Sequence, residues 1–284
     1  MSATHTISRR VDSRRSPSPA LVPEGPAAGS LVGYLRHVVV VAKRSLIKTW
    51  RTPEALIDVT VQPIIFLAMF TYIFGGAIAP SGSQQQYLQF LLPGILGQTI
   101  AMAGIALGTN LNTDIEKGIF DRFRSLPIGR SVPLVGAVAA DVARYITLCV
   151  VTMSAGYLMG FRIGTNWGSA LAAMALCVAF ALCFCWISVF VGMVARTSGS
   201  VQAIGFLIVL PLSFGSNTFV PTSTMPGWLQ AFVNVNPISH LVSTVRALML
   251  GGSYGNNLAW TLGWMAVLLI VFVPLALWGY RKRA

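Results

Sequence analysis

The chain has 284 residues, of which 55% are hydrophobic and only 10% charged, and its mean hydropathy is +0.70. Soluble domains carry about a quarter charged residues, so this composition excludes an ordinary soluble protein and indicates an integral membrane protein. A net charge of +12 would also suit nucleic-acid binding, but the distribution of the basic residues, described below, fits membrane topology instead.

The N-terminal segment, residues 1–30, is rich in Ser, Pro and Gly and carries four arginines between positions 9 and 15. These arginines resemble the charged start of a signal peptide, but no apolar run follows them. We expect residues 1–30 to form a disordered basic cytosolic tail. Residues 31–284 are expected to form the membrane domain.

The segment Leu31–Arg51 has the pattern of a basic amphipathic helix that lies flat in the cytosolic interface and ends before Pro53. The sequence does not separate a mere orientation anchor from a mechanical role. Its basic face and its interfacial tryptophan are carried by Arg36, Lys43, Arg44, Lys48, Arg51 and Trp50.

Six stretches are apolar and long enough for membrane spans, since a transmembrane helix needs about 20 such residues. The fifth is the least regular, because Pro211 and several hydroxyl side chains interrupt it. The second contains the pair Gly104 and Gly108, a spacing that allows close helix packing. The six predicted spans are Val59–Ala79, Phe90–Leu111, Val132–Gly160, Gly168–Val194, Val201–Val220 and Leu258–Tyr280.

The basic residues predict the orientation of these spans. With the N-terminus in the cytosol, 18 of the 20 Lys and Arg residues lie on the cytosolic side, and only Arg162 and Arg246 lie outside. This is the positive-inside distribution, so we expect both termini in the cytosol. A lone arginine at position 246 is expected to extend to the outer interface.

The carboxylates exclude several functions, because the chain has eight and none follows Asp141. Arg144, three residues later on the same helix face, predicts a structural ion pair with it. Without intramembrane carboxylates a proton relay is not expected. His240 has no carboxylate nearby in sequence for a catalytic triad. There is no phosphate-binding loop, no cofactor motif and no metal-ligand cluster around the four cysteines, so we expect no catalysis and an external source of energy.

Between the second and third spans, Thr113–Pro127 reads as a cytosolic helix. Thr113 and Glu116 have the spacing of an N-terminal capping box, and Pro127 ends the helix. One side is apolar and needs a partner, which from physics alone is equally the lipid surface or another protein. The segment also includes Gly118, Ile119, Phe120, Asp121, Arg122, Phe123, Arg124 and Leu126.

Between the fifth and sixth spans, Pro221–Gly252 reads as two short helices, Met225–Val235 and Pro237–Leu250. Asn236 suits an N-cap and Pro237 the first helical position. A helix of 14 residues reaches only about 21 Å, too short to cross a bilayer, so we expect an outer re-entrant hairpin. Residues assigned to it are Asn217, Pro221, Pro226, Trp228, Asn236, Pro237, His240 and Arg246.

Two of these segments resemble a known family. Residues 116–128, EKGIFDRFRSLPI, followed by Asp141 and Arg144, are similar to the cytosolic loop of daunorubicin/doxorubicin-resistance permeases, type-2 ATP-binding-cassette (ABC) exporters. The outer runs at 216–222, 225–230 and 236–240, with Arg246, resemble the same family. The resemblance spans about residues 31–284.

The resemblance implies an all-α membrane domain of six spans that forms a homo- or heterodimer. Each copy would engage a separately encoded ATPase, which holds ATP and Mg²⁺. It implies that Leu31–Arg51 is an interfacial connecting helix, that Thr113–Leu126 is the coupling helix, and that members export drugs, antibiotics or lipids from the cell. An ion-coupled carrier and a membrane enzyme or scaffold are the alternatives.

The sequence does not name a substrate. Weak candidates for substrate contact are polar or aromatic residues within the spans, namely Gln62, Phe66, Phe70 and Gln98.

Overall fold

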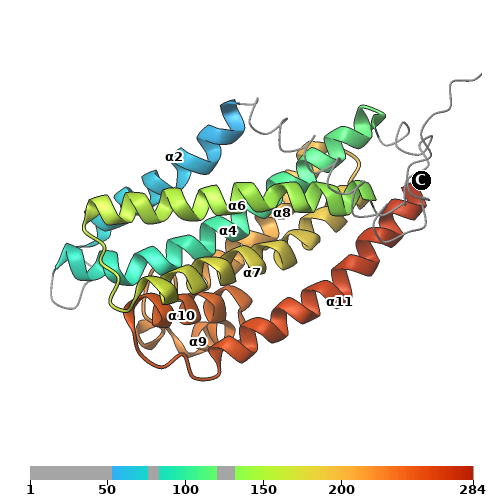
Figure 1. The fold of residues 1–284 in the computed structure, drawn as a ribbon. Helices are drawn as coiled ribbons and strands as arrows, with labels where there is room; N and C mark the ends of the chain where they lie inside the picture. The colour runs from blue at the N-terminus through green and yellow to red at the C-terminus, as the bar shows by residue number, and fades with distance from the viewer. Residues whose placement is uncertain (1–52, 76–82, 120–131, 284) are drawn as a thin grey trace, which may run out of the picture.

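The computed structural model describes residues 53–75, 83–119 and 132–283, and every regular element in these ranges is a helix (Figure 1). The predicted tail, the interfacial helix with its residues Arg36 to Arg51, and the coupling residues Phe120 to Pro127 lie outside the described residues.

Four helices are long and apolar enough to cross a membrane: α4 (Gln84–Glu116), α6 (Val132–Met159), α7 (Trp167–Val194) and α11 (Asn257–Arg283). Two shorter apolar helices accompany them. The first, α2 (Pro53–Met69), continues as the π-helix η1 (Phe70–Phe74), and the second is α8 (Ser198–Phe214). The chain is therefore a multi-pass membrane protein, as its composition predicts.

The predicted fifth span was too long. Helix α8 ends at Phe214, where Gly215 donates its backbone N–H to the Pro211 carbonyl, and Val220 lies beyond the helix. The residues that follow α8 are held by their own hydroxyl groups. Ser216, for example, donates to the Ser213 carbonyl over 2.6 Å. Polar side chains that satisfy backbone groups locally compete with a helix, which explains the early end.

The predicted capping box at Thr113 was also wrong, because α4 runs through it without a break. The Thr113 hydroxyl donates to the Thr109 carbonyl over 2.9 Å, the bond of a threonine inside a helix. The helix ends instead at Glu116, and Gly118 follows with a φ of +68° and an N–H that reaches the Ile115 carbonyl over 2.9 Å. Glycine adopts this left-handed conformation without steric cost, so Gly118 was the informative residue.

Helix α4 lies at the centre of the molecule and packs on α2, α6, α7, α8 and α10 (Figure 1). Its closest approach is to α7. A Cβ added at Gly108 would lie 2.1 Å from the Ser188 carbonyl oxygen, and one at Gly192 would lie 2.5 Å from the Gly108 oxygen. The predicted role of Gly108 in close packing is confirmed, whereas Gly104 has ordinary clearance of 3.5 Å to Cys185.

The predicted pair of short helices is present as α9 (Gly227–Val235) and α10 (Pro237–Leu250), preceded by a 3₁₀ turn, η2 (Thr222–Thr224). Asn236 is the N-cap, as predicted: its Oδ1 accepts from the Ile238 N–H over 2.9 Å. Pro237 occupies the first position of α10. Pro221 and Pro226 precede η2 and α9, and Trp228 on α9 is 75% exposed.

Both ends of α10 contact segments at one end of the helical array. Asn236 donates to the carbonyls of Leu212 and Gly215 at the end of α8. At the other end of α10, Met249 accepts from the N–H of Gly164, in the α6–α7 connection, over 2.9 Å. In Figure 1 this end is opposite to the C-terminal ends of α4 and α11.

Candidate functional site

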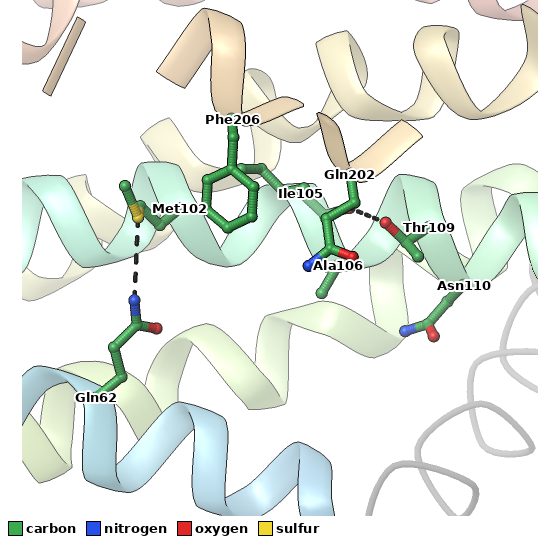
Figure 2. A pocket seen from close by; sticks show the side chains of 8 residues that line it. All are labelled: Gln62, Met102, Ile105, Ala106, Thr109, Asn110, Gln202 and Phe206. Atoms are coloured by element: carbon green, nitrogen blue, oxygen red, sulfur yellow. Dashed lines mark hydrogen bonds between the residues drawn. The ribbon is translucent and has the colours of Figure 1, made fainter. Parts of the chain in front are cut away.

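A pocket of about 200 Å³ lies between α2, α4 and α8. Figure 2 shows its side chains directed toward a common space from the three helices. Helix α2 contributes one residue, α8 two and α4 the remainder. The lining residues are Gln62, Met102, Ile105, Ala106, Thr109, Asn110, Gln202 and Phe206.

The pocket combines amides with apolar groups. The Gln62 amide nitrogen lies 4.0 Å from the Met102 sulfur, a weak hydrogen bond, while Gln202 and Asn110 are exposed. The Thr109 hydroxyl already donates to the Ile105 carbonyl over 3.1 Å. The amides therefore offer donors and acceptors to a ligand, and Phe206 and Met102 offer a surface for an apolar or aromatic body.

One of the four predicted substrate-contact residues, Gln62, lines this pocket. Gln98 is only 2% exposed, so it is inside the protein instead. Phe66 and Phe70 stack on each other with ring centroids 6.1 Å apart, and Phe70 stacks on Phe219 at 4.3 Å. These rings join α2 to the segment after α8, and neither lines the pocket.

The sequence reasoning missed the α8 side of the pocket. Gln202 is the only amide side chain on α8, four residues after its first residue, and such an isolated amide in an apolar helix was a usable signal. Asn110 and Thr109 stand near the end of a predicted span and gave no comparable signal.

The predicted ion pair on α6 is confirmed. Asp141 Oδ2 and Arg144 Nη2 are 2.9 Å apart, and the two residues are 7% and 8% exposed. The guanidinium also donates to the Ala103 carbonyl of α4. The pair thus fastens α6 to α4 inside the protein. Removing one member of a buried pair leaves an uncompensated charge.

Arg246 does not extend outward, contrary to expectation. Its Nε and Nη2 donate to the Phe90 carbonyl over 3.2 and 3.0 Å, and Nη2 also reaches the Asn217 carbonyl over 3.1 Å. Its guanidinium carbon lies 3.8 Å from the centroid of the Phe90 ring. Arg246 therefore connects α10 to α4.

Two other predicted hairpin residues are also connectors. The Asn217 amide donates to the Ser243 hydroxyl over 2.7 Å. His240 Nδ1 lies 2.9 Å from Asn257 Oδ1, and its ring stacks on Trp260 at 5.5 Å. These contacts tie α10 to the segment after α8 and to the start of α11.

The described residues contain no group of three His, Cys, Asp or Glu side chains suited to a metal ion. All four cysteines are buried and free of disulfides.

Comparison with known proteins places this fold in a family. Residues 36–250 match the family model of the ABC-2 type transporter. The chain is 39% identical over 267 residues to the daunorubicin resistance ABC transporter permease protein DrrB1 of Streptomyces coeruleorubidus, covering 88% of this chain and 94% of that protein. It is 27% identical over 194 residues to the doxorubicin resistance ABC transporter permease protein DrrB of Mycobacterium tuberculosis, covering 66% of each.

The matched region contains the pocket, the ion pair and the α9–α10 segment. The chain therefore belongs to the ABC-2 type transporter family, as a permease subunit that works with a separate ABC ATPase.

Proposed function

We propose that this permease exports a hydrophobic, drug-like molecule of the daunorubicin class through the α2–α4–α8 pocket. The names of the relatives suggest the chemical class of the cargo. The observation that carries the proposal is the pocket itself, in which amides face apolar side chains between helices of the membrane domain. Anthracyclines present a flat aromatic body and polar substituents, which such a lining can contact.

We infer six spans, with α2–η1 and α8 added to the four long helices, and α9–α10 as a re-entrant hairpin. Helix α8 has 17 residues, about 25 Å of helix. That is slightly less than the hydrocarbon thickness of about 30 Å, and local thinning or flanking polar residues can accommodate the difference. Residues 1–30 are proposed as the cytosolic tail and 31–284 as the transporter domain.

A second permease copy is proposed to cover the open side of the pocket. Pockets for drug-sized ligands measure about 300–1,000 Å³, more than the 200 Å³ that one copy provides. Exposed amides such as Gln202 are also costly against hydrocarbon, so this face needs protein or a water-filled cavity beside it. The dimer would reside in the bacterial inner membrane, and its ATPase subunits would supply ATP and Mg²⁺.

Replacing Gln202 by leucine is the direct test of the pocket. Loss of one hydrogen bond to the cargo costs about 0.5–1.5 kcal/mol, so we expect KM for doxorubicin to rise about two- to tenfold with kcat little changed. The measurement is ATP-dependent accumulation of doxorubicin in inverted vesicles that contain the permease and its ATPase.

Gln84→Leu, a change of an exposed glutamine at the opposite end of α4, is the matched control and should leave KM unchanged. Transport should survive an uncoupler and stop when ATP is removed. Flux that depends on the ion gradient would instead mean a different transport class, and an unchanged KM in Gln202→Leu would reject the pocket.

The proposed orientation gives a second prediction. With both termini in the cytosol, a reporter that works only in the cytosol should be active when it is fused after Arg283. A reporter that works only outside the cytosol should be active when it is inserted at Ser83. The reason is that α4 begins near Ser83 and four long helices separate the two positions, with α8 making the fifth crossing. Reporters on the same side would contradict the six-span topology.

A further inference from the structure

The cytosolic end of α4 is bonded to the turn between α7 and α8. Asn112 is fully buried, and its amide nitrogen donates to the Gly192 carbonyl over 2.8 Å and to the Ala195 carbonyl over 2.9 Å. The last carbonyls of a helix lack partners within that helix. Asn112 therefore caps α7 from another helix.

One turn later, Glu116 bonds to the other side of the same turn. Its Oε1 accepts from the backbone N–H of Ser198 over 3.0 Å, and Ser198 is the first residue of α8. A carboxylate is favoured there because the first N–H groups of a helix are unpartnered and carry partial positive charge. Thus Glu116 does not cap its own helix, as the sequence suggested, but holds the start of α8.

Helices α4 and α7 are also locked sterically. The backbones of Gly108 and Gly192 approach so closely that neither position has room for a Cβ. This contact lies one turn before Asn112 on α4, and on α7 it involves Gly192, the residue whose carbonyl Asn112 binds. Since packed backbones do not slide freely, a displacement of this end of α4 must carry the α7–α8 turn with it.

The bonds from α4 to the α7–α8 turn lie between two functional elements, the predicted coupling segment and the pocket. Toward the cytosol, α4 ends at Glu116, and Gly118 follows with a φ of +68° within the predicted coupling segment Thr113–Leu126. Toward the membrane, α8 carries Gln202 and Phe206, four and eight residues after Ser198, into the pocket.

We propose that Asn112 and Glu116 are positioning residues that transmit motion of the coupling segment to α8, and so to the pocket. This inference rests on the proposed function for its cargo and on the family's ATPase for its source of motion. In it, ATP-driven movement of the segment after Gly118 pulls α4, and the two side chains make α8 follow as one body. The pocket wall formed by α8 then moves relative to α2.

The test uses the full permease–ATPase complex in vesicles and compares three variants. Asn112→Leu and Glu116→Leu replace the bonding groups by an apolar side chain, Asn112→Leu with the same number of side-chain heavy atoms, whereas Glu116→Gln keeps an acceptor oxygen at the same reach. We expect the two leucine variants to retain the ATPase and its hydrolysis rate. Doxorubicin moved per ATP hydrolysed should fall at least about fivefold, the lower range of coupling between distant sites. Glu116→Gln should stay close to the wild type.

A second readout is independent of the cargo. A bimane fluorophore on Ala203→Cys, at an exposed position of α8 outside the pocket lining, should change emission when ATP is added to the wild-type complex. The change should be absent in both leucine variants and present in Glu116→Gln. If the wild type shows the ATP-driven change in bimane emission but does not transport doxorubicin, the proposed cargo is wrong. The inference about Asn112 and Glu116 is then judged from the bimane emission alone.

Three results would overturn the proposal: a normal bimane response in the leucine variants, a parallel loss of ATPase retention and transport, or failure of Glu116→Gln as severe as that of Glu116→Leu. The second would mean that the bonds only stabilise the fold. The third would mean that the hydrogen bond is not what matters at this position.

Discussion

Replacing Phe120 and Phe123 together by alanine is expected to release the ATPase from the permease and abolish export. The sequence pattern predicts both side chains on the apolar side of the segment that follows Gly118 and resembles a coupling helix. Aromatic anchors at the centre of an interface often contribute at least about 2 kcal/mol each. Losing both would weaken retention about 1,000-fold, by the relation of tenfold per 1.4 kcal/mol. Co-purification of the ATPase through a tag on the permease measures it.

The permease itself should still insert and purify, because alanine favours helix and the changes lie outside the membrane spans. Asp121→Asn is the comparison within the same segment, and it should have a smaller effect if that carboxylate lies at the rim of the interface. Undiminished retention of the ATPase with normal transport would show that the segment binds the membrane surface instead.

Gly108→Ala is expected to lower the midpoint of thermal denaturation by about 3–10 °C, since overpacking costs about 1–3 kcal/mol in a protein of this size. The added Cβ would lie 2.1 Å from a backbone oxygen of α7, which cannot rotate away. Gly104→Ala, one turn earlier, is the matched control. Its Cβ would meet Cys185 at 3.5 Å, and alanine is the better helix former, so its midpoint should not fall.

The double variant Gly108→Ala, Gly192→Ala tests whether the two added methyl groups disturb the same contact between α4 and α7. Each single change forces the same two backbones apart, so the double change should cost less than the sum of the two. Additive costs, or equal melting of the Gly104 and Gly108 variants, would contradict the close contact. Both outcomes are read from denaturation curves in one detergent.

Much of the fold was predictable because the chain follows strong local rules. Apolar length located the long helices, and Asn236-Pro237 at the start with Gly251 at the end gave the bounds of α10. The spacing of Asp141 and Arg144 predicted their ion pair, since residues three apart share a helix face.

The fifth span was overestimated for a local reason, whereas other errors occurred where a residue's partner is distant in sequence. Thr113 and Glu116 fit a capping box by spacing, but Glu116 bonds to Ser198, 82 positions away. Arg246 reads as an outward-facing charge until Phe90, 156 positions earlier, supplies a carbonyl. The pocket was missed for the same reason, because Gln62, Asn110 and Gln202 come together only through the packing of three helices.

Because its four cysteines are buried, the folded chain does not react with thiol reagents that cannot enter its interior. Cys149, Cys177 and Cys185 are fully covered, and Cys183 is 6% exposed. A maleimide therefore labels an introduced cysteine, such as that of Ala203→Cys, in the otherwise native chain. The rate at which the maleimide reacts with the four native thiols measures how fast the helical array opens. Because membrane proteins seldom unfold reversibly, this labelling rate measures their kinetic stability, and the measurement does not require the protein to refold.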